Sequence, residues 1–349
     1  MIFPLIKPQT IFSFSSAEHS AEVKKVLPKS KKHYDEVFER ELIKLNPAQL
    51  EAVNQVDGPV LVIAGPGTGK THLLAARIGK ILKSTDTLPY NILCLTYTEA
   101  GTIAMRQRLL EFIGPEAYRV NIYTFHAFCN EIIQRYPDYF GSRELEPISE
   151  LETADLLMQL LDGLDSSNPL KRKRGNIYYD VPLLKDLFRK MKEESWSPEK
   201  ISMAIDEYLD DLPNREEYIY KRANAKMKIE TGDVKQHLID GEKEKMEKLR
   251  EASKLFPVFR NRMEESKRYD YNDMILWVLE AFKNDEEFLR IHQEKYLYFL
   301  VDEFQDTNGA QSEILNQLTN YWDKPNVFAV GDDDQSVFEF QGARIKNIL

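Results

Sequence analysis

The sequence of 349 residues contains only two cysteines, Cys94 and Cys129, which cannot form a disulfide framework or a cysteine-rich zinc site. It has no apolar run of the ~18 residues that a membrane-spanning helix needs, so no membrane partner is expected. The first residues lack a basic region ahead of their short apolar patch and therefore do not read as a signal peptide. Together these absences predict a protein of the reducing cytoplasm.

Basic residues are also in the minority, because 47 Lys and Arg stand against 57 Asp and Glu, for a formal net charge of −10. This balance disfavours a uniformly basic coat that binds nucleic acid non-specifically. A basic groove can still lie on an acidic body, so a specific nucleic-acid site stays open. The 42% of hydrophobic residues is enough for a sizeable core and excludes a disordered or collagen-like chain. At about 150 residues per domain, the length predicts roughly two domains.

From Leu45 onward, short apolar runs alternate with amphipathic helical stretches. The first run, 59–64, is expected to be a fully buried strand, and the helix after it covers 71–82. The other expected strands cover residues 91–98, 120–125, 296–302 and 327–331. Continuous apolar strands separated by helices indicate a doubly wound α/β fold, in which helices cover both faces of a parallel sheet.

The stretch between residues 128 and 269 lacks comparable strands and is rich in Leu, Lys and Glu at helical spacing. We interpret it as a mostly helical domain inserted between two strands of the sheet. The expected division is an N-terminal extension (1–40), a first part of the sheet domain (41–127), the insert (128–269) and a second part of the sheet domain (270–349).

The segment AGPGTGKT, residues 64–71, follows an expected strand and opens an expected helix, which is the context of a phosphate-binding P-loop. Its glycines let backbone N–H groups curl around phosphate oxygens at the helix N-terminus. Lys70 is expected to reach the β- and γ-phosphates, and the hydroxyl of Thr71 to ligate Mg²⁺. The nucleotide-binding residues expected in this loop are Gly65, Pro66, Gly67, Thr68, Gly69, Lys70 and Thr71. A glycine-rich turn without a ligand is the alternative interpretation.

Two acidic segments, VDEFQD (301–306) and VGDDDQS (330–336), each follow an apolar strand. An Asp at such a strand end can hold Mg²⁺, and a following Glu can activate the attacking water, so Asp302 and Glu303 fit these roles. Gln335 is a candidate sensor of the γ-phosphate. Alone, each segment is more often a solvated acidic turn, and the P-loop upstream favours the functional interpretation.

Six segments occur in a fixed order along the chain: LNPAQLEAV, AGPGTGKT, LTYTEAGTIAMRQRL, YTFHAFC, FLVDEFQDTN and VGDDDQSVFEFQGA. With them, the chain resembles the N-terminal half of UvrD/Rep/PcrA-type superfamily 1 DNA helicases over about Leu45 to Ala343. The resemblance implies a RecA-like domain with an inserted helical domain. It also implies ATP-dependent translocation and unwinding with 3′–5′ polarity, the cofactors ATP and Mg²⁺, and a role in DNA repair.

The resemblance adds roles for single residues. Gln49 matches a glutamine that reads the adenine edge, and His72 stands where an Arg often packs by the adenine. The DNA-binding residues that it implies are Tyr97, Thr124, His126 and Phe340, of which Tyr97 and Phe340 would stack on bases. Without the resemblance, Tyr97 and Phe340 would be interpreted as aromatic residues of the core, and His126 as a structural histidine. Gln341 replaces an Arg of the family pattern.

Family helicases also carry a second RecA-like domain with arginine fingers, and none follows Leu349. We therefore expect a motor fragment that alone is nearly inactive as an ATP hydrolase. Its expected partners are single-stranded or partly duplex DNA and the C-terminal motor domain of the same protein. The alternatives are the motor part of a helicase–nuclease and a non-catalytic, nucleotide-dependent DNA-binding module. The water-activating Glu303 argues against the second alternative.

Overall fold

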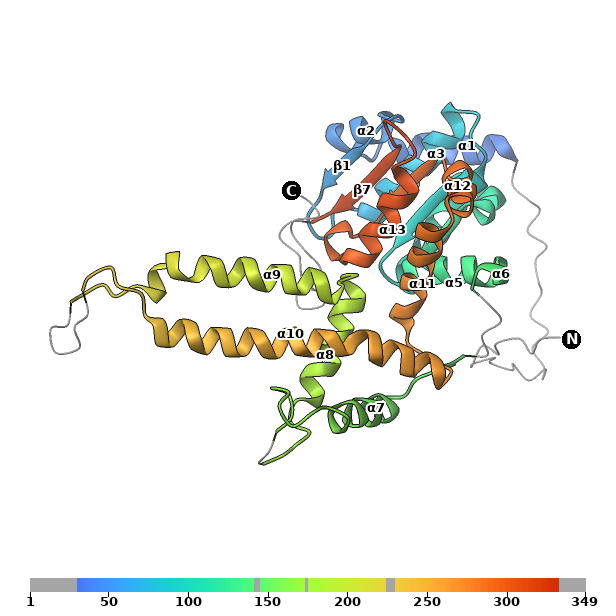
Figure 1. Cartoon of the computed structure of the whole chain (residues 1–349). Coiled ribbons are helices and arrows are strands. Elements are labelled where there is room, and N and C mark those ends of the chain that lie inside the picture. The colour runs from blue at the N-terminus through green and yellow to red at the C-terminus, as the bar shows by residue number, and fades with distance from the viewer. Residues whose placement is uncertain (1–29, 141–144, 173–174, 224–229, 333–349) are drawn as a thin grey trace, which may run out of the picture.

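The structure, a computed structural model, describes residues 30–140, 145–172, 175–223 and 230–332. Its centre is a parallel sheet of five strands in the order β1-β7-β6-β2-β3 (Figure 1). The strands are β1 (Val60–Ile63), β2 (Ile92–Thr96), β3 (Asn121–Thr124), β6 (Tyr298–Val301) and β7 (Val327–Gly331). The predicted α/β class with a parallel RecA-like sheet is confirmed.

Helices cover both faces of this sheet, and the alternation of side chains along a strand divides its residues between two cores. Ile92 and Cys94 of β2 face one core, whereas Leu93 and Leu95 face the other. The first core is closed by α1 (Lys31–Leu42), α2 (Pro47–Asn54), α3 (Lys70–Ser84) and α4 (Glu99–Ile113). The second core is closed by α5 (Phe125–Arg135), α11 (Tyr271–Asn284), α12 (Glu286–Lys295) and α13 (Gly309–Thr319). Burial on both faces explains why the central strands are apolar throughout.

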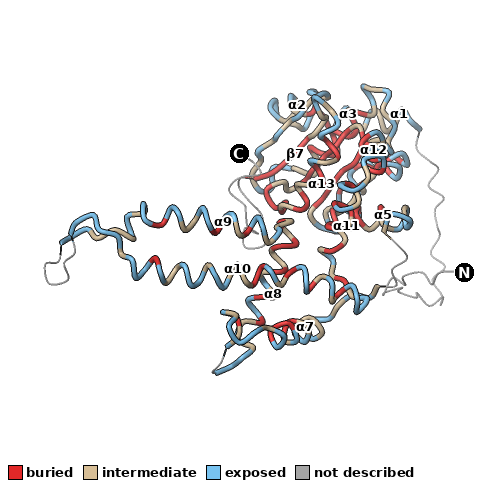
Figure 2. Tube along the Cα trace, viewed as in Figure 1, coloured by how far each residue is buried: buried red, intermediate tan, exposed pale blue. Residues whose placement is uncertain are grey.

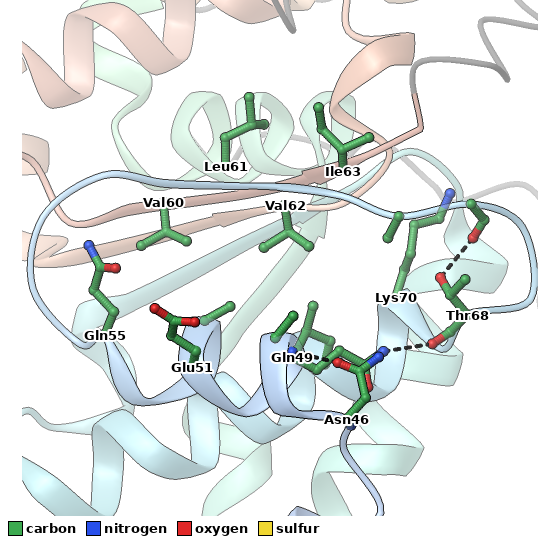
Figure 3. Close-up of a pocket in the computed structure, with 15 residues that line it drawn as sticks. Asn46, Gln49, Glu51, Gln55, Val60, Leu61, Val62, Ile63, Thr68 and Lys70 are labelled. Carbon is green, nitrogen blue, oxygen red and sulfur yellow. Dashed lines mark hydrogen bonds between the residues drawn. The ribbon is translucent and has the colours of Figure 1, made fainter.

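Strand β1 is an exception, and the prediction that it is fully buried is wrong, because Val60 and Val62 are only half-buried and the other face is exposed. Val60 and Val62 point toward α2, whereas Leu61 and Ile63 point the opposite way and are 46% and 55% exposed (Figure 3). The reason is position, because β1 is the edge strand and the second core contains no residue of it. An apolar run thus does not reveal whether a strand is covered on both sides.

The described part of the expected N-terminal extension packs on the sheet domain. Phe38 of α1 is 1% exposed and lies against α3 at Gly79. A Cβ atom on Gly79 would lie 2.5 Å from Cε2 of the Phe38 ring, so any side chain there would overlap the ring. This close approach fixes α1 on the outer side of the first core.

The helical insert has a core of its own. It consists of α7 (Glu150–Asp162), α8 (Val181–Glu193), α9 (Pro198–Asp211) and α10 (Gln236–Glu265). Its buried apolar residues include Leu157, Leu161, Leu184, Phe188, Ile201, Phe256 and Phe259. Helices α9 and α10 run side by side away from the sheet (Figure 1), and exposed residues dominate their far ends (Figure 2).

The smaller elements connect these parts. They are α6 (Pro137–Phe140), β4 (Glu146–Pro147), β5 (Arg268–Tyr269), and the 3-10 turns η1 (Pro89–Asn91), η2 (Gly114–Arg119), η3 (Leu212–Asn214), η4 (Glu216–Tyr218) and η5 (Phe304–Asp306). Strands β4 and β5 pair where the chain enters and leaves the insert. The expected boundary at residue 128 falls inside α5, whose Phe128, Cys129 and Ile132 belong to the second core of the sheet.

A buried ion pair joins the insert to the sheet domain. Lys192, near the end of α8, is 1% exposed, and its Nζ lies 2.7 Å from Asp270 Oδ2 and 2.8 Å from Asp273 Oδ1. Asp270 caps the N-terminus of α11 and forms a capping box with Asp273. Removing either side of such a pair leaves an uncompensated buried charge, so the contact holds α8 against α11. No helix in the described part of the chain is long and apolar enough to cross a membrane.

Candidate functional site

The loop between β1 and α3 forms an open cradle of backbone N–H groups. Gly67 and Gly69 have φ angles of 70° and 86°, in the left-handed region that favours glycine. Gly69 is the N-cap of α3 and provides no side-chain cap, so the first turn of the helix points its N–H groups outward for an anion. The Thr68 hydroxyl donates to the Gly65 carbonyl at 2.7 Å and closes the loop. The sequence-predicted P-loop therefore has the geometry of a phosphate site.

Helix α2 is tied to this loop by Gln49. Asn46 caps α2 in a capping box, in which the Asn46 N–H donates to Gln49 Oε1 and the Gln49 N–H to Asn46 Oδ1. The other end of the Gln49 amide, Nε2, donates to the Thr68 carbonyl at 3.0 Å (Figure 3). Gln49 thus lies beside the P-loop, and both ends of its amide are engaged there. Its NH₂ group keeps a second N–H donor and its oxygen a second lone pair for a ligand such as an adenine.

A cleft of about 460 Å³ opens between α2, β1 and the P-loop (Figure 3), within the size range of small-molecule sites. The residues that line it are Asn46, Ala48, Gln49, Glu51, Ala52, Gln55, Val60, Leu61, Val62, Ile63, Ala64, Gly65, Thr68, Lys70 and Leu73. Lys70 and Thr68 lie at one end of this group beside Gln49, and Glu51 and Gln55 lie at the other end (Figure 3). The cleft thus extends from the phosphate cradle and Gln49 along α2.

Strand β6 ends at the edge of the sheet where the P-loop lies, so the acidic side chains that follow it reach Lys70. Lys70 Nζ lies 2.7 Å from Glu303 Oε2, and the Lys70 side chain is 10% exposed. Glu303 has a left-handed backbone (φ 48°, ψ 49°), which is uncommon for a residue with a side chain. Asp302 is buried beside it, and its Oδ1 accepts from the Glu303 N–H at 3.1 Å. The structure therefore brings Lys70, Asp302 and Glu303 together, as the sequence analysis expects.

The carboxylates at this edge carry more negative charge than Lys70 balances. Burial, and next the charge of Glu303, raises the pKa of Asp302 to about 6, and the same causes in the same order raise the pKa of Asp306 to about 6. A cation placed beside Asp302 would relieve this repulsion. Mg²⁺ fits, because it is commonly held by one or two carboxylates together with phosphate oxygens and water, and Thr71 lies in the first turn of α3 next to the cradle. Among the described residues, no group of three or more His, Cys, Asp or Glu side chains could hold a metal by itself.

His72 points away from the cleft. Its ring packs edge-on against Phe112 with the centroids 5.3 Å apart, and its Nε2 lies 3.4 Å from the Glu41 carbonyl oxygen. His72 is not among the residues that line the cleft, although it follows Thr71 directly. The structure thus places it on the side of α1 and α4.

Three residues expected to contact DNA lie at the ends of β2 and β3, which are neighbours in the sheet. Tyr97 follows β2 and is half-buried, and burial raises the pKa of its hydroxyl. Thr124 caps α5, and its hydroxyl accepts from the Ala127 N–H. His126 lies in the first turn of α5, and burial lowers its pKa. Gln335 and Phe340 lie outside the described residues.

Other polar and aromatic side chains lie beside the expected site residues, some next to Glu303 and some next to His126. The sequence analysis assigned them no role. Gln305 and Asp306 belong to the same turn as Glu303, and Gln305 is 1% exposed. Tyr271, which is 67% exposed, packs edge-on against the His126 ring, and Asn272 Oδ1 lies 3.4 Å from His126 Nε2. The polar residues of the segment VDEFQD can be identified from the sequence. The contact between α11 and His126 is a tertiary contact that the sequence does not indicate.

Comparisons with known proteins agree with this geometry. A family model described as the UvrD/REP helicase N-terminal domain matches residues 45–349. The ATP-dependent DNA helicase PcrA of Bacillus subtilis is 30% identical over 305 residues, which cover 87% of this chain and 35% of that protein. PcrA proteins of Staphylococcus epidermidis and Staphylococcus aureus are 28% and 27% identical, with the same coverage of each chain. The chain spans about a third of the length of these relatives. It belongs to the UvrD/REP helicase family and carries that family's N-terminal domain.

Proposed function

We propose that this chain is the part of an ATP-dependent DNA helicase that binds Mg²⁺–ATP and single-stranded DNA. The observation that carries the proposal is the 2.7 Å contact between Lys70 Nζ and Glu303 Oε2 beside a glycine cradle with left-handed backbone. It joins the phosphate-binding and water-activating functions at one edge of the sheet. We further propose that the protein acts in the cytoplasm on repair substrates with 3′–5′ polarity.

In this proposal, the P-loop N–H groups and Lys70 hold the β- and γ-phosphates, with charge-assisted contacts from the ammonium. Asp302 and Thr71 hold Mg²⁺, which when bound neutralises phosphate charge. Glu303 orients the attacking water and accepts its proton. Gln49 recognises the adenine with the second N–H donor and the second lone pair of its amide.

The proposed DNA track runs over the ends of β2 and β3. Tyr97 stacks on a base, and Thr124 and His126 contact the sugar–phosphate backbone. Phe340 stacks on a second base, and Gln335 senses the γ-phosphate. Aromatic stacking suits this task because every base offers a π-face, so the grip does not depend on sequence.

We propose that the 349-residue chain alone hydrolyses ATP slowly. Phosphoryl transfer needs positively charged groups beside the γ-phosphate oxygens to stabilise the transition state. An arginine finger raises the rate by about 10³- to 10⁵-fold in related NTPases. The resemblance places such a residue in a second RecA-like domain. Within this proposal, residues 41–127 and 270–349 form one motor domain and residues 128–269 its helical insert.

The test is steady-state phosphate release by the chain, with and without a single-stranded oligonucleotide, together with unwinding of a forked duplex. We expect ATP binding with slow release, little stimulation by DNA and no strand separation. Glu303→Gln should bind ATP and abolish the residual release, and the control is Glu116→Gln, since Glu116 is exposed and lies in η2, after the C-terminal end of α4. Fast, DNA-stimulated turnover would contradict the need for a second domain, and DNA binding without any nucleotide binding would contradict the proposed function.

A further inference from the structure

Gln305 is a buried amide that connects the carboxylate of Glu303 to the end of β7. Its side chain is 1% exposed. Its Nε2 donates to Glu303 Oε2 at 2.8 Å, and its Oε1 accepts from the backbone N–H of Asp332 at 3.0 Å. Both ends of the amide are therefore bonded, and they reach groups that are 29 residues apart in the sequence.

These partners determine the orientation of the amide. Asp332 offers a backbone N–H, which only the amide oxygen can accept, whereas Glu303 offers a carboxylate, which only the NH₂ group can donate to. The reversed amide would place its oxygen against the carboxylate of Glu303 and its NH₂ against an N–H donor. It would also lose the longer contact, 3.4 Å, from Nε2 to Asp306 Oδ2. Few other residues could satisfy both partners, because the position needs a donor and an acceptor at a fixed separation.

The far end of this connection lies close to the P-loop. Asp332 follows β7 directly, and the carbonyl of the preceding Gly331 accepts from the Ala64 N–H at 2.8 Å. Ala64 is the residue at which β1 passes into the P-loop. The chain after Asp332 leads within three residues to Gln335, the expected γ-phosphate sensor. Gln305 thus lies between the residue expected to activate water and the strand end expected to report on the phosphate.

We propose that Gln305 is a positioning residue that couples the carboxylate of Glu303 to the end of β7, so that a displacement of either one is passed to the other. The inference rests on the proposed function, in which Glu303 activates water. It adds a residue to which the sequence analysis gave no role. Gln305 does not touch the reacting atoms and acts through Glu303.

Lys70 and Gln305 share one oxygen of the Glu303 carboxylate, so the coupling matters most when Lys70 leaves that oxygen. Lys70 and Gln305 both contact Oε2 of Glu303, at 2.7 and 2.8 Å. Phosphates that draw Lys70 away remove the stronger, charged donor and leave the Gln305 amide on that oxygen. The carboxylate then keeps its place beside Asp302 and Asp306 through a bond that is anchored on β7. A change at the phosphate end can reach the strand by this bond.

The test measures hydrogen exchange at the Asp332 amide by nuclear magnetic resonance on the nucleotide-free chain. Gln305→Met should speed exchange at Asp332 by about tenfold, because its hydrogen bond is lost. Gln305→Glu keeps an acceptor for Asp332 and should retain its protection, but it cannot donate to the Glu303 carboxylate. The matched control is Gln293→Met, since Gln293 is also buried and donates only to the Gln317 carbonyl.

A double-mutant cycle separates coupling from simple packing. In the wild-type background, Glu303→Ala should speed exchange at Asp332 about threefold, because Gln305 connects the two residues. In the Gln305→Met background, which lacks this connection, Glu303→Ala should have no effect. An equal effect in both backgrounds, or exchange at Asp332 that is the same in Gln305→Met as in Gln293→Met, would overturn the coupling. These readings need no nucleotide, so they are independent of the proposed function, which fails separately if the wild-type chain does not bind Mg²⁺–ATP.

Discussion

Lys70 and Glu303 are paired across the nucleotide site, with Nζ and Oε2 2.7 Å apart. The lysine expected to bind phosphate and the glutamate expected to activate water therefore neutralise each other. A phosphate that binds Lys70 is expected to compete with the Glu303 carboxylate, and the departure of Lys70 would free Oε2 of Glu303 from its charged partner. The ion pair thus links phosphate binding to the exposure of the base.

The first prediction follows from this competition. Glu303→Gln should tighten Mg²⁺–ATP binding by about fivefold, because Lys70 no longer has to leave a charged partner and one negative charge near the phosphates is removed. Calorimetric titration of the wild type and the variant measures the difference. Glu116→Gln, which breaks an exposed ion pair with Arg119, should bind ATP like the wild type. Weaker binding by Glu303→Gln would show that the pair does not oppose the nucleotide.

The second prediction concerns pH. The pKa of Asp302 rises from its ordinary 3.8 to about 6 on folding, mainly through burial, so the folded chain holds this proton more tightly than the unfolded chain. Its contribution to stability is present below about pH 4 and is lost as pH rises through about 6. Asp302→Asn should raise the unfolding free energy at pH 7 by on the order of 2 kcal/mol and change it little at pH 4.

Urea unfolding between pH 4 and 8, without metal, measures this effect. The control is Asp323→Asn, because Asp323 is exposed and lies away from the site. If the difference between Asp302→Asn and the wild type stays constant over this range, the buried carboxyl does not have the raised pKa described here.

A third prediction concerns the support of α2. Arg77 of α3 is 1% exposed, donates to the carbonyls of Ala52, Val53 and Val56, and lies 5.0 Å from the centroid of the Phe328 ring. Arg77→Met should lower the unfolding free energy by about 2–4 kcal/mol, because it leaves buried carbonyls at the end of α2 without donors. Urea denaturation measures the loss. Arg108→Met, at an exposed ion pair, should cost less than about 0.5 kcal/mol, and a similar loss for the two variants would refute the role of Arg77.

The fourth prediction concerns DNA. If Tyr97 stacks on a base, Tyr97→Ala should weaken single-strand binding by about 1–3 kcal/mol, equally for different oligonucleotide sequences. Tyr90 lies before the other end of the same strand and is 49% exposed, so Tyr90→Ala should leave DNA affinity unchanged. Fluorescence anisotropy gives the affinity, and a melting curve gives the stability. A Tyr97→Ala chain that is destabilised but binds DNA normally would show that the ring serves packing alone.

The sheet and the P-loop were predictable because their signals are local. Strands such as β2 and β6 are buried on both faces and consist almost entirely of apolar residues, and Gly67 and Gly69 of the P-loop stand where left-handed backbone is required. The proximity of the acidic residues after β6 to Lys70 was predictable from the topology, since parallel strands bring their carboxyl ends to one edge.

The remaining features depend on contacts between distant residues. Nothing in the run 59–64 distinguishes an edge strand from a central one, so the exposure of Leu61 and Ile63 was not predictable. The partner of Gln305 is the backbone of Asp332, and a backbone N–H has no sequence signature. The same holds for Arg77, whose acceptors are carbonyls of another helix.

The most direct test of the central claim is a titration of Mg²⁺–ATP into the wild-type chain, Lys70→Ala and Lys80→Ala. Lys80 lies on the same helix but does not line the cleft. We predict one binding site that requires Mg²⁺, a loss of about ten- to a hundredfold in affinity for Lys70→Ala, and wild-type affinity for Lys80→Ala. Equal affinities of the wild type and Lys70→Ala would contradict the assignment of this loop as the phosphate site, and with it the proposed motor function.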